Sequence, residues 1–430
     1  MSILLGKMCY QVNGQKELTS DKEIIKLDAP SEIKIPLTTG NVSCEAYVKE
    51  GDKVKVGTKL SARNDHFYVP FYSPISGTVK GIEKVMHSSL KKVDHLVIEN
   101  DGKYEVEPPL KPLDFEKATH KELLEFVKEA GLVGCGGAGF PTYVKYMMPD
   151  KIDTLIINAV ECEPFITSDY RGIYDNLDLF VHGVRAMYKL SGGKVGLVAI
   201  KEDKVDLISK LEEAFSKYPE IKVSKVPNVY PMGWERTLVY ELVKKRYVKL
   251  PAEVGCVVSN ATTAIALGDA LINGMPITKK LITVSGDGIN SPANVLAYVG
   301  TPVKELIKAC GGYSGENTIL IAGGPMMGKS MVSDEYVIEL ASNSATVLKD
   351  APIDEIACLR CGRCSDHCPS GLQPVRINSA EKVKDLELLK KLSVMDCIEC
   401  GLCTFICPSK IQVTEGIRKA KRYFALNNKK

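Results

Sequence analysis

The sequence predicts a multidomain α/β protein with a small metal-binding domain at its C-terminal end. Its 430 residues are enough for about three ordinary domains. Strand-like and helix-like segments alternate through the middle of the chain, which is typical of a parallel sheet covered by helices. Eight of the 14 cysteines lie in two short runs after residue 357. In a long chain this clustering favours metal binding over disulfides.

The composition argues against several classes of protein. Hydrophobic residues make up 45% and charged residues 25% of the chain, as in soluble globular proteins. A net charge of +3 and a single Trp do not favour a nucleic-acid partner. The start "MSILLGKMCYQVNG" has no long apolar region, and no stretch approaches the roughly 18 apolar residues that span a bilayer. We therefore expect a cytoplasmic protein, or one held at the inner face of the membrane by its partners.

The N-terminal module, assigned to residues 1–115, is predicted to be β-rich. Between residues 35 and 85, short strand-like segments alternate with Gly-Asp and Ser-Gly turns. This arrangement resembles the barrel-sandwich hybrid of lipoyl and biotinyl carriers. A carrier needs a lysine at the tip of its exposed hairpin, and the tip region 61–69 has none. We therefore interpret the module as structural or docking, followed by the linker "PPLKPLD".

The central domain, residues 116–278, is predicted to be α/β. "THKELLEFVKEA" predicts a helix with Thr119 as its N-cap. "DTLIINAVECEP" contains an apolar strand from Leu155 to Val160. "KVGLVAIK" and "IKVSKVPNV" predict further strands, with the amphipathic helix "DKVDLISKLEEAFSKY" between them. Ligands of such sheets bind at the carboxyl ends of the strands.

A glycine-rich loop is the first candidate binding element of this domain. In "GLVGCGGAGFPTYVK" the backbone is bare at Gly134, Gly136, Gly137 and Gly139. Bare amides can approach a phosphate or a flat ring closely, although a tight structural turn would look the same. Glu161 and Glu163 follow the next strand, where they could bind ribose hydroxyls or belong to a solvated loop.

The two cysteine runs predict iron–sulfur clusters. "ACLRCGRCSDHCPS" and "DCIECGLCTFICPS" share the pattern C-x-x-C-x-x-C-x-x-x-C-P, in which Gly362 and Gly401 help the backbone curl. In two-cluster ferredoxins the fourth cysteine of each run binds the cluster of the other run. Zinc is the alternative, but zinc sites usually pair two C-x-x-C knuckles across a longer gap. We therefore predict two [4Fe–4S] clusters, one held by Cys358, Cys361, Cys364 and Cys407 and the other by Cys397, Cys400, Cys403 and Cys368.

Clusters pass single electrons, so a hydride donor requires a converter upstream, and flavin is the usual one. Four further segments occur in an order that resembles the RnfC electron-transport subunits: "GCGGAGFPT", "NAVECEP", "YPMGWERTLVYEL" and "VVSNATTAIALGDAL". "GTPVKELIKACGG" and "IAGGPMMG" are also RnfC-like. The flavoprotein subunit of respiratory complex I is more distantly similar. The resemblance covers nearly the whole chain.

The resemblance implies the fold and the cofactors. It implies a barrel-sandwich hybrid, a complex I flavoprotein-like α/β core, an SLBB-like β-grasp module at 279–340 and a helical two-cluster ferredoxin-type domain at 345–430. It also implies bound FMN and NADH. The implied pocket consists of the glycine-rich loop with Lys145, Asn158, Glu161, Glu163, Glu235, Ser259 and Asn260.

Two features depart from the RnfC pattern. The usual N-terminal His-Pro segment is missing, and Cys135 occupies a loop position that is usually apolar in RnfC and arginine in complex I. Both features resemble PrdC, an RnfC-like protein linked to proline reductase, in which this position can carry selenocysteine. A thiol among bare amides should have a lowered pKa. We hypothesise that Cys135 takes part catalytically in electron or hydride relay, with an inert cysteine as the alternative.

The sequence therefore predicts an electron-transfer protein, with an NADH-dependent oxidoreductase activity. Electrons would pass from NADH through flavin and two [4Fe–4S] clusters to a partner reductase, with D-proline reductase as the favoured acceptor. One alternative is the peripheral RnfC subunit of a membrane-bound, ion-translocating complex, whose partners are the other Rnf subunits. Another is a cluster-bearing scaffold without NADH activity. The choice between NADH and NADPH stays open, and the basic C-terminal helix (Arg418, Lys419, Lys421 and Arg422) is expected to be a solvated face or to steer an acidic partner.

Overall fold

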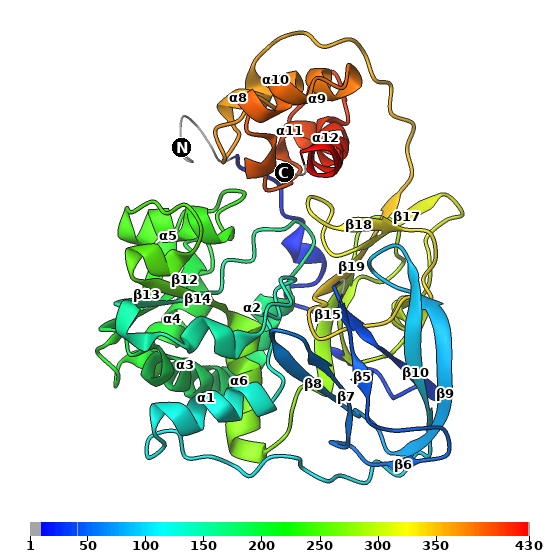
Figure 1. The fold of residues 1–430 in the computed structure, drawn as a ribbon, viewed down its shortest axis with the longest axis vertical. Helices are drawn as coiled ribbons and strands as arrows, with labels where there is room; N and C mark the ends of the chain where they lie inside the picture. Colours follow the sequence, from blue (N-terminus) through cyan, green and yellow to red (C-terminus); the bar gives the residue numbers. More distant parts are fainter. Residues whose placement is uncertain (1–9, 41, 429–430) are drawn as a thin grey trace.

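The computed structural model describes residues 10–40 and 42–428 (Figure 1). A β-rich module, an α/β domain and a third module with a six-stranded sheet form the body of the protein. A small helical module lies above this body and is joined to it by a segment without helix or strand over residues 350–362. No helix in the described part of the chain is both long and apolar enough to cross a bilayer.

Two small sheets and the two-stranded pair β3-β4 form the barrel-sandwich module, which confirms this part of the predicted fold. In one sheet the order is β2-β10-β9-β6, and in the other it is β5-β7-β8. Ile33 and Ile35 point into the core while Lys34 between them does not, as the two-residue period of a strand requires. The strands are β2 (Glu32–Pro36), β3 (Thr38–Thr39), β4 (Val42–Ser43), β5 (Glu45–Ala46), β6 (Lys53–Val54), β7 (Lys59–Asn64), β8 (Tyr68–Tyr72), β9 (Gly77–Met86) and β10 (Lys92–Asn100).

The β7–β8 hairpin packs against the central domain. The Tyr72 hydroxyl donates to the carbonyl oxygen of Glu129 at 2.6 Å, and the ammonium of Lys59 lies 3.0 Å from the Glu129 carboxylate. At the hairpin tip, the rings of Phe67 and Phe140 meet edge to face with 5.5 Å between their centroids. In a carrier domain this hairpin tip carries the swinging arm. Here the tip packs against the central domain instead.

The central domain is a parallel sheet, β13-β12-β11-β14, between helices. Thr119 and Glu122 form a capping box at the start of α1, as the sequence predicts. The strand predicted to end at Val160 ends at Asn158, because the Asn158 side chain accepts the Val160 amide and turns the chain out of the sheet. The elements are α1 (His120–Glu129), β11 (Thr154–Asn158), α2 (Ser168–Asp175), α3 (Leu177–Ser191), β12 (Val195–Lys201), α4 (Val205–Phe215), β13 (Ile221–Val226), α5 (Glu235–Val243), β14 (Cys256–Asn260) and α6 (Ala261–Asn273).

The third module is a mixed sheet in the order β1-β16-β15-β19-β17-β18. Its first strand, β1 (Ile25–Lys26), comes from the N-terminal part of the chain and pairs in parallel with β16. This strand belongs to the range 1–115 that the sequence assigns to the N-terminal module, and its pairing with β16 could not be predicted because a two-residue strand leaves no pattern in the sequence. The remaining elements are β15 (Lys279–Ser285), β16 (Ala293–Tyr298), α7 (Val303–Ala309), β17 (Thr318–Ala322), β18 (Lys329–Met331) and β19 (Ser344–Lys349).

The C-terminal module is helical and has its own apolar core. Ile377, Leu389 and Ile417 are completely or almost completely buried within it. The segment between the two cysteine runs forms two helices, because Lys384 adopts a left-handed conformation and Asp385 caps the second helix. The helices are α8 (Arg363–Asp366), α9 (Pro374–Lys382), α10 (Leu386–Lys391), α11 (Leu402–Phe405) and α12 (Val413–Asn427).

Candidate functional site

Two asparagines meet at the carboxyl edge of the central sheet. Asn158 ends β11 and pairs in register with Asn260, which ends β14. Asn260 caps α6 by accepting the amides of Thr262 and Thr263, and its own amide donates to Asp169 at 2.7 Å. This edge, where parallel strands end and a helix begins, is the usual ligand site of such sheets.

The glycine-rich loop lies against this edge. A Cβ atom on Gly136 would come within 2.8 Å of the Asn260 amide nitrogen, so a side chain there would require the loop or the asparagine to shift. Gly136 and Gly137 are exposed, and Gly137 has a φ of 99°, which favours glycine. The loop therefore presents bare backbone beside the sheet edge, a surface that fits a flat ring or a phosphate.

Cys135 is part of this loop, but its thiol faces inward. Only 1% of the residue is exposed, and Sγ donates to the carbonyl oxygen of Val133 at 3.4 Å. The Cys135 amide donates to the hydroxyl of Thr263 on α6. This geometry does not support the hypothesis of an accessible redox thiol, because the side chain packs beneath the loop.

Three further residues of the implied pocket are held by the protein itself. The Lys145 ammonium donates to the Val258 carbonyl oxygen at 2.8 Å. Burial lowers the pKa of Lys145, and the nearby Glu235 partly opposes that shift. Glu235 accepts the hydroxyl of Tyr247, and Ser259 shares a 2.7 Å hydrogen bond with Tyr146. Each of these three side chains is therefore hydrogen-bonded within the protein.

The two acids after β11 have different partners. Glu161 accepts the amide of Asp169 at 2.9 Å and lies 3.9 Å from the ammonium of Lys16, and burial raises its pKa. Glu163 instead accepts the amides of Met326 and Met327 in the third module. Its carboxylate therefore joins two modules, which differs from the predicted place in a nucleotide pocket.

The two cysteine runs have the same backbone path. Arg360 and Glu399 both have a φ of 55°, and Gly362 and Gly401 both have a φ of 78°. In each run this curl aims a backbone amide at the first sulfur. The Arg360 amide lies 3.4 Å from the sulfur of Cys358, and the Glu399 amide lies 3.3 Å from the sulfur of Cys397. Amides directed at sulfur are typical of iron–sulfur sites.

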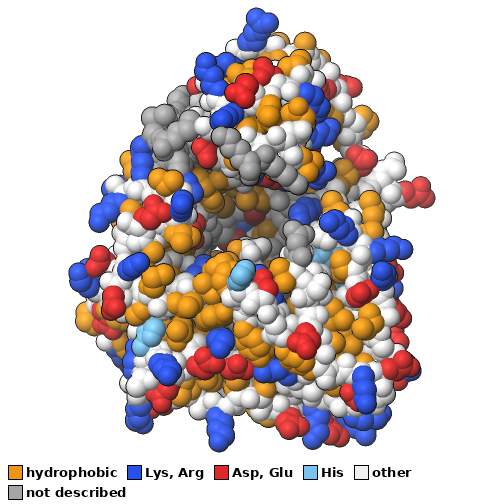
Figure 2. Space-filling view, viewed as in Figure 1, with side chains coloured by type: hydrophobic (Ala, Val, Ile, Leu, Met, Phe, Trp, Pro, Cys, Tyr) orange, Lys and Arg blue, Asp and Glu red, His pale blue; other side chains and the backbone are white. Residues whose placement is uncertain are grey.

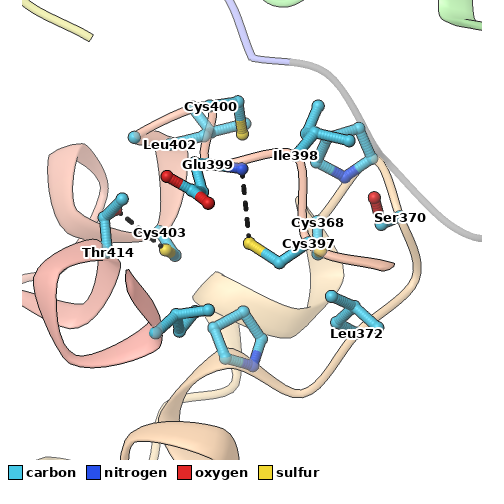
Figure 3. Close-up of a pocket in the computed structure, with 14 residues that line it drawn as sticks. Cys368, Ser370, Leu372, Cys397, Ile398, Glu399, Cys400, Leu402, Cys403 and Thr414 are labelled. Atoms are coloured by element: carbon cyan, nitrogen blue, oxygen red, sulfur yellow. Dashed lines mark hydrogen bonds between the residues drawn. The ribbon is translucent and has the colours of Figure 1, made fainter. Parts of the chain in front are cut away.

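Four thiols line one pocket in the C-terminal module (Figure 3). They belong to Cys397, Cys400 and Cys403 of the second run and to Cys368 of the first. This is the crossed ligand set that the sequence predicts for one cluster. The apolar residues Leu402 and Ile417 line the same pocket. Four cysteines lining one pocket are the ligand set that a [4Fe–4S] cluster would take.

The basic C-terminal helix supports the second run. Arg418 and Lys421 of α12 both bind the carboxylate of Glu399, at 3.2 and 2.6 Å. Of the four basic residues that the sequence places on a solvated face, Arg418 and Lys421 therefore form ion pairs within the module. The cysteines outside the runs differ in exposure: Cys135, Cys256 and Cys310 are buried, Cys44 and Cys162 are half-buried, and Cys9 lies outside the described residues.

Several residues that shape the site could not be found from the sequence. Lys16, Lys201 and Lys204 line a second pocket with Glu161, at the ends of β11 and β12. Burial lowers the pKa of Lys16 to about 8. Lys16 lies in a segment without helix or strand periodicity, so no local pattern marked it. Tyr230 begins the segment "YPMGWERTLVYEL", and its place there gives no sign of the hydrogen bond that its hydroxyl donates to the carbonyl oxygen of Cys400.

Comparisons with known proteins decide the family. The chain matches four family models: the RnfC barrel-sandwich hybrid domain over residues 10–103, the Nuo51 FMN-binding domain over 127–269, the SLBB domain over 281–330 and the 4Fe-4S dicluster domain over 351–408. One component of the Na⁺-translocating ferredoxin:NAD⁺ oxidoreductase complex of Acetobacterium woodii is 33% identical, covering 97% of this chain and 96% of the relative. The chain belongs to the RnfC family.

Other relatives agree with this assignment. The corresponding component of the proton-translocating ferredoxin:NAD⁺ oxidoreductase complex of Clostridium ljungdahlii is 36% identical, covering 84% of this chain and 80% of the relative. That of the ion-translocating oxidoreductase complex of Rhodobacter capsulatus is 35% identical, covering 88% of this chain and 75% of the relative. None of these three names refers to proline reductase.

A likeness of fold extends to a solved structure. An NAD⁺-reducing [NiFe]-hydrogenase in its air-oxidised state aligns with a TM-score of 0.51 at 18% identity, over 71% of this chain and 62% of that chain. The four family models confirm the predicted RnfC resemblance, the four-part fold and the content of FMN and two clusters. This RnfC-family chain is an electron-transfer protein with an FMN-binding domain and a domain for two [4Fe–4S] clusters.

Proposed function

We propose that this chain is the peripheral RnfC component of an ion-translocating complex that exchanges electrons with NAD(H). The nicotinamide nucleotide binds at the edge formed by Asn158, Asn260 and the glycine-rich loop, where FMN is also held. Bound FMN supplies the conversion between hydride transfer and single electrons. The two clusters then connect this edge to the other components of the complex. The sequence alone favoured proline reductase as the acceptor, whereas the full-length relatives favour the ion-translocating complex.

One observation carries the proposal. A single chain holds a bare glycine loop at a sheet edge and a separate pocket lined by four thiols. The first suits a nucleotide or a flat ring, which handles electron pairs, and the second suits a centre that handles single electrons. A scaffold with clusters alone would not need the bare loop or the asparagine pair beside it.

Purification under anaerobic conditions tests the proposal. We expect acid treatment to release flavin, and we expect NADH to reduce an artificial acceptor such as ferricyanide. If no flavin is released and NADH reduces no acceptor, the alternative of a cluster-bearing scaffold without NADH activity is favoured. In cell extracts, co-purification with membrane-embedded Rnf partners supports the proposal, whereas exclusive co-purification with proline reductase contradicts it. NADPH tested beside NADH decides the nucleotide preference.

A further inference from the structure

The two cysteine runs have different surroundings. In the second run, Cys400 is only 8% exposed, and it packs with Leu402 and Ile406 against Tyr230 and Met326 of the body. The segment 351–363, which contains Cys358 and Cys361 of the first run, is exposed throughout. Later in that run, the ring of His367 packs against Tyr10 with 5.2 Å between the ring centroids. The cluster pocket formed mainly by the second run therefore faces the body, whereas Cys358 and Cys361 of the first run are exposed to solvent.

Tyr230 connects the central domain to this pocket. Tyr230 is only 1% exposed, and its hydroxyl donates to the carbonyl oxygen of Cys400 at 2.6 Å. The backbone of Tyr230 is held in turn by Tyr10, with which it exchanges two hydrogen bonds of 2.8 Å. A buried hydrogen bond of this length, between residues 170 positions apart, fixes the cysteine ligand relative to the central domain.

Met326 completes this contact from the third module. A Cβ atom on Gly401 would lie 2.4 Å from the Met326 carbonyl oxygen, so only glycine permits the approach. The amide of Met326 is bound by Glu163, which follows β11 of the central domain. Gly362 occupies the matching position in the first run with the same φ of 78°, yet nothing lies within 4 Å of its added Cβ.

We propose that Tyr230 and Met326 form the contact, called the seat below, that holds the C-terminal module against the central domain. Electrons pass between the two domains at this contact. The cluster of Cys368, Cys397, Cys400 and Cys403 is then the inner one, and the cluster of Cys358, Cys361, Cys364 and Cys407 is the outer one. Tyr230 is a positioning residue, because it acts through the backbone of a cluster ligand. The direction of transfer rests on the proposed function, whereas the seat itself does not.

The electrons balance in this arrangement. Oxidation of one NADH yields NAD⁺, one proton and two electrons, and the two electrons cross the seat one at a time. Two one-electron acceptors at the outer cluster are reduced for each NADH. Reduction of NAD⁺ by a one-electron donor protein runs the same sequence in reverse and consumes one proton.

The first test is a redox titration of the dithionite-reduced protein followed by electron paramagnetic resonance. Tyr230→Phe removes a donor near one cluster, so we expect the midpoint potential of the inner cluster alone to fall. Cys361→Ser identifies the signal of the outer cluster. The matched control is Tyr423→Phe, since the Tyr423 hydroxyl also donates to a backbone carbonyl of this module, that of Lys384. If the midpoint potentials of both clusters are unchanged in Tyr230→Phe, the proposed role of the seat in positioning the inner cluster is wrong.

The second test compares Gly401→Ala with Gly362→Ala. Both add the same backbone strain, but only Gly401→Ala pushes against Met326. We expect dithionite to reduce both clusters in both variants, and NADH to reduce them about tenfold more slowly in Gly401→Ala alone. Equal slowing in both variants would overturn the inference. If NADH fails to reduce the wild-type clusters, the proposed function is wrong. The Tyr230→Phe titration then still tests whether the seat positions the inner cluster.

Discussion

The carboxylate of Glu163 accepts the backbone amide of Met327 at 2.8 Å. It accepts the amide of Met326 as well, and a Cβ on Gly324 would come within 2.4 Å of the same carboxylate. The glycine-rich "IAGGPMMG" segment of the third module is therefore shaped around an acid of the central domain. This contact holds together the two modules that support the C-terminal pocket.

Glu163 should make stability depend on pH. Burial raises the pKa of its carboxyl from 4.5 to about 7, so between these values the folded chain binds more protons there than the unfolded chain. The contribution of this group to stability therefore falls as pH rises through that window. We expect Glu163→Gln to flatten this part of the profile of thermal midpoint against pH. Exposed Glu213→Gln is the control, and an unchanged slope in Glu163→Gln would contradict the assignment.

Glu163→Gln should also lower stability at acid and neutral pH alike. A glutamine offers one acceptor oxygen, so one of the two methionine amides would face an NH₂ group instead. An unsatisfied buried donor costs about 1–3 kcal/mol. Thermal or denaturant unfolding of the two proteins at one pH measures this loss.

Gly136→Ala should reduce flavin binding. Its Cβ would lie 2.8 Å from the Asn260 amide nitrogen, so the loop or the asparagine must move. We expect less acid-released flavin per chain, with iron content unchanged because the clusters lie in another module. Gly315→Ala serves as the control, since no atom lies within 4 Å of its added Cβ. Full flavin content in Gly136→Ala would mean that the loop is not part of the flavin site.

Cys135→Ser should retain electron transfer. The thiol is buried beneath the loop and bonded to Val133, so we expect NADH oxidation near the wild-type rate and a modest loss of stability. In the native protein, iodoacetamide should label the half-buried Cys44 before Cys135. Loss of turnover in a folded, flavin-loaded Cys135→Ser protein would instead restore the relay hypothesis.

Cys368→Ser should damage the cluster of the other run. Cys368 belongs to the first run but lines the pocket of Cys397, Cys400 and Cys403. We expect loss of the inner cluster's resonance and retention of the outer one, with about half of the iron remaining. Cys407→Ser should show the reverse. Loss of the outer signal in Cys368→Ser would mean that each run binds its own cluster.

Local features of this chain were predictable from the sequence. The spacing of the cysteines and the placement of Gly362 and Gly401 determine a backbone curl that involves only neighbouring residues, and the structure shows that curl twice. The capping box at Thr119 and the strand–helix alternation of the central domain are equally local. The crossed ligand set followed from a spacing rule, and the pocket that contains Cys368 agrees with it.

Features that depend on packing were not predictable. Glu161 and Glu163 stand two positions apart, yet one faces Lys16 and the other binds methionine amides more than 160 positions away. Figure 2 shows a hollow at the centre of one face, below the C-terminal module. No periodicity within a strand or helix carries information about such neighbours.

The sequence by itself determined the kinds of chemistry: thiols spaced for iron–sulfur clusters and bare amides for a nucleotide or flavin. Those properties reside in the spacing of adjacent residues. Only the tertiary structure decided that Cys135 points inward and that the second cysteine run sits on Tyr230 and Met326. Burial and hydrogen bonding between distant segments are settled when the modules pack, because each buried polar group must then find a partner.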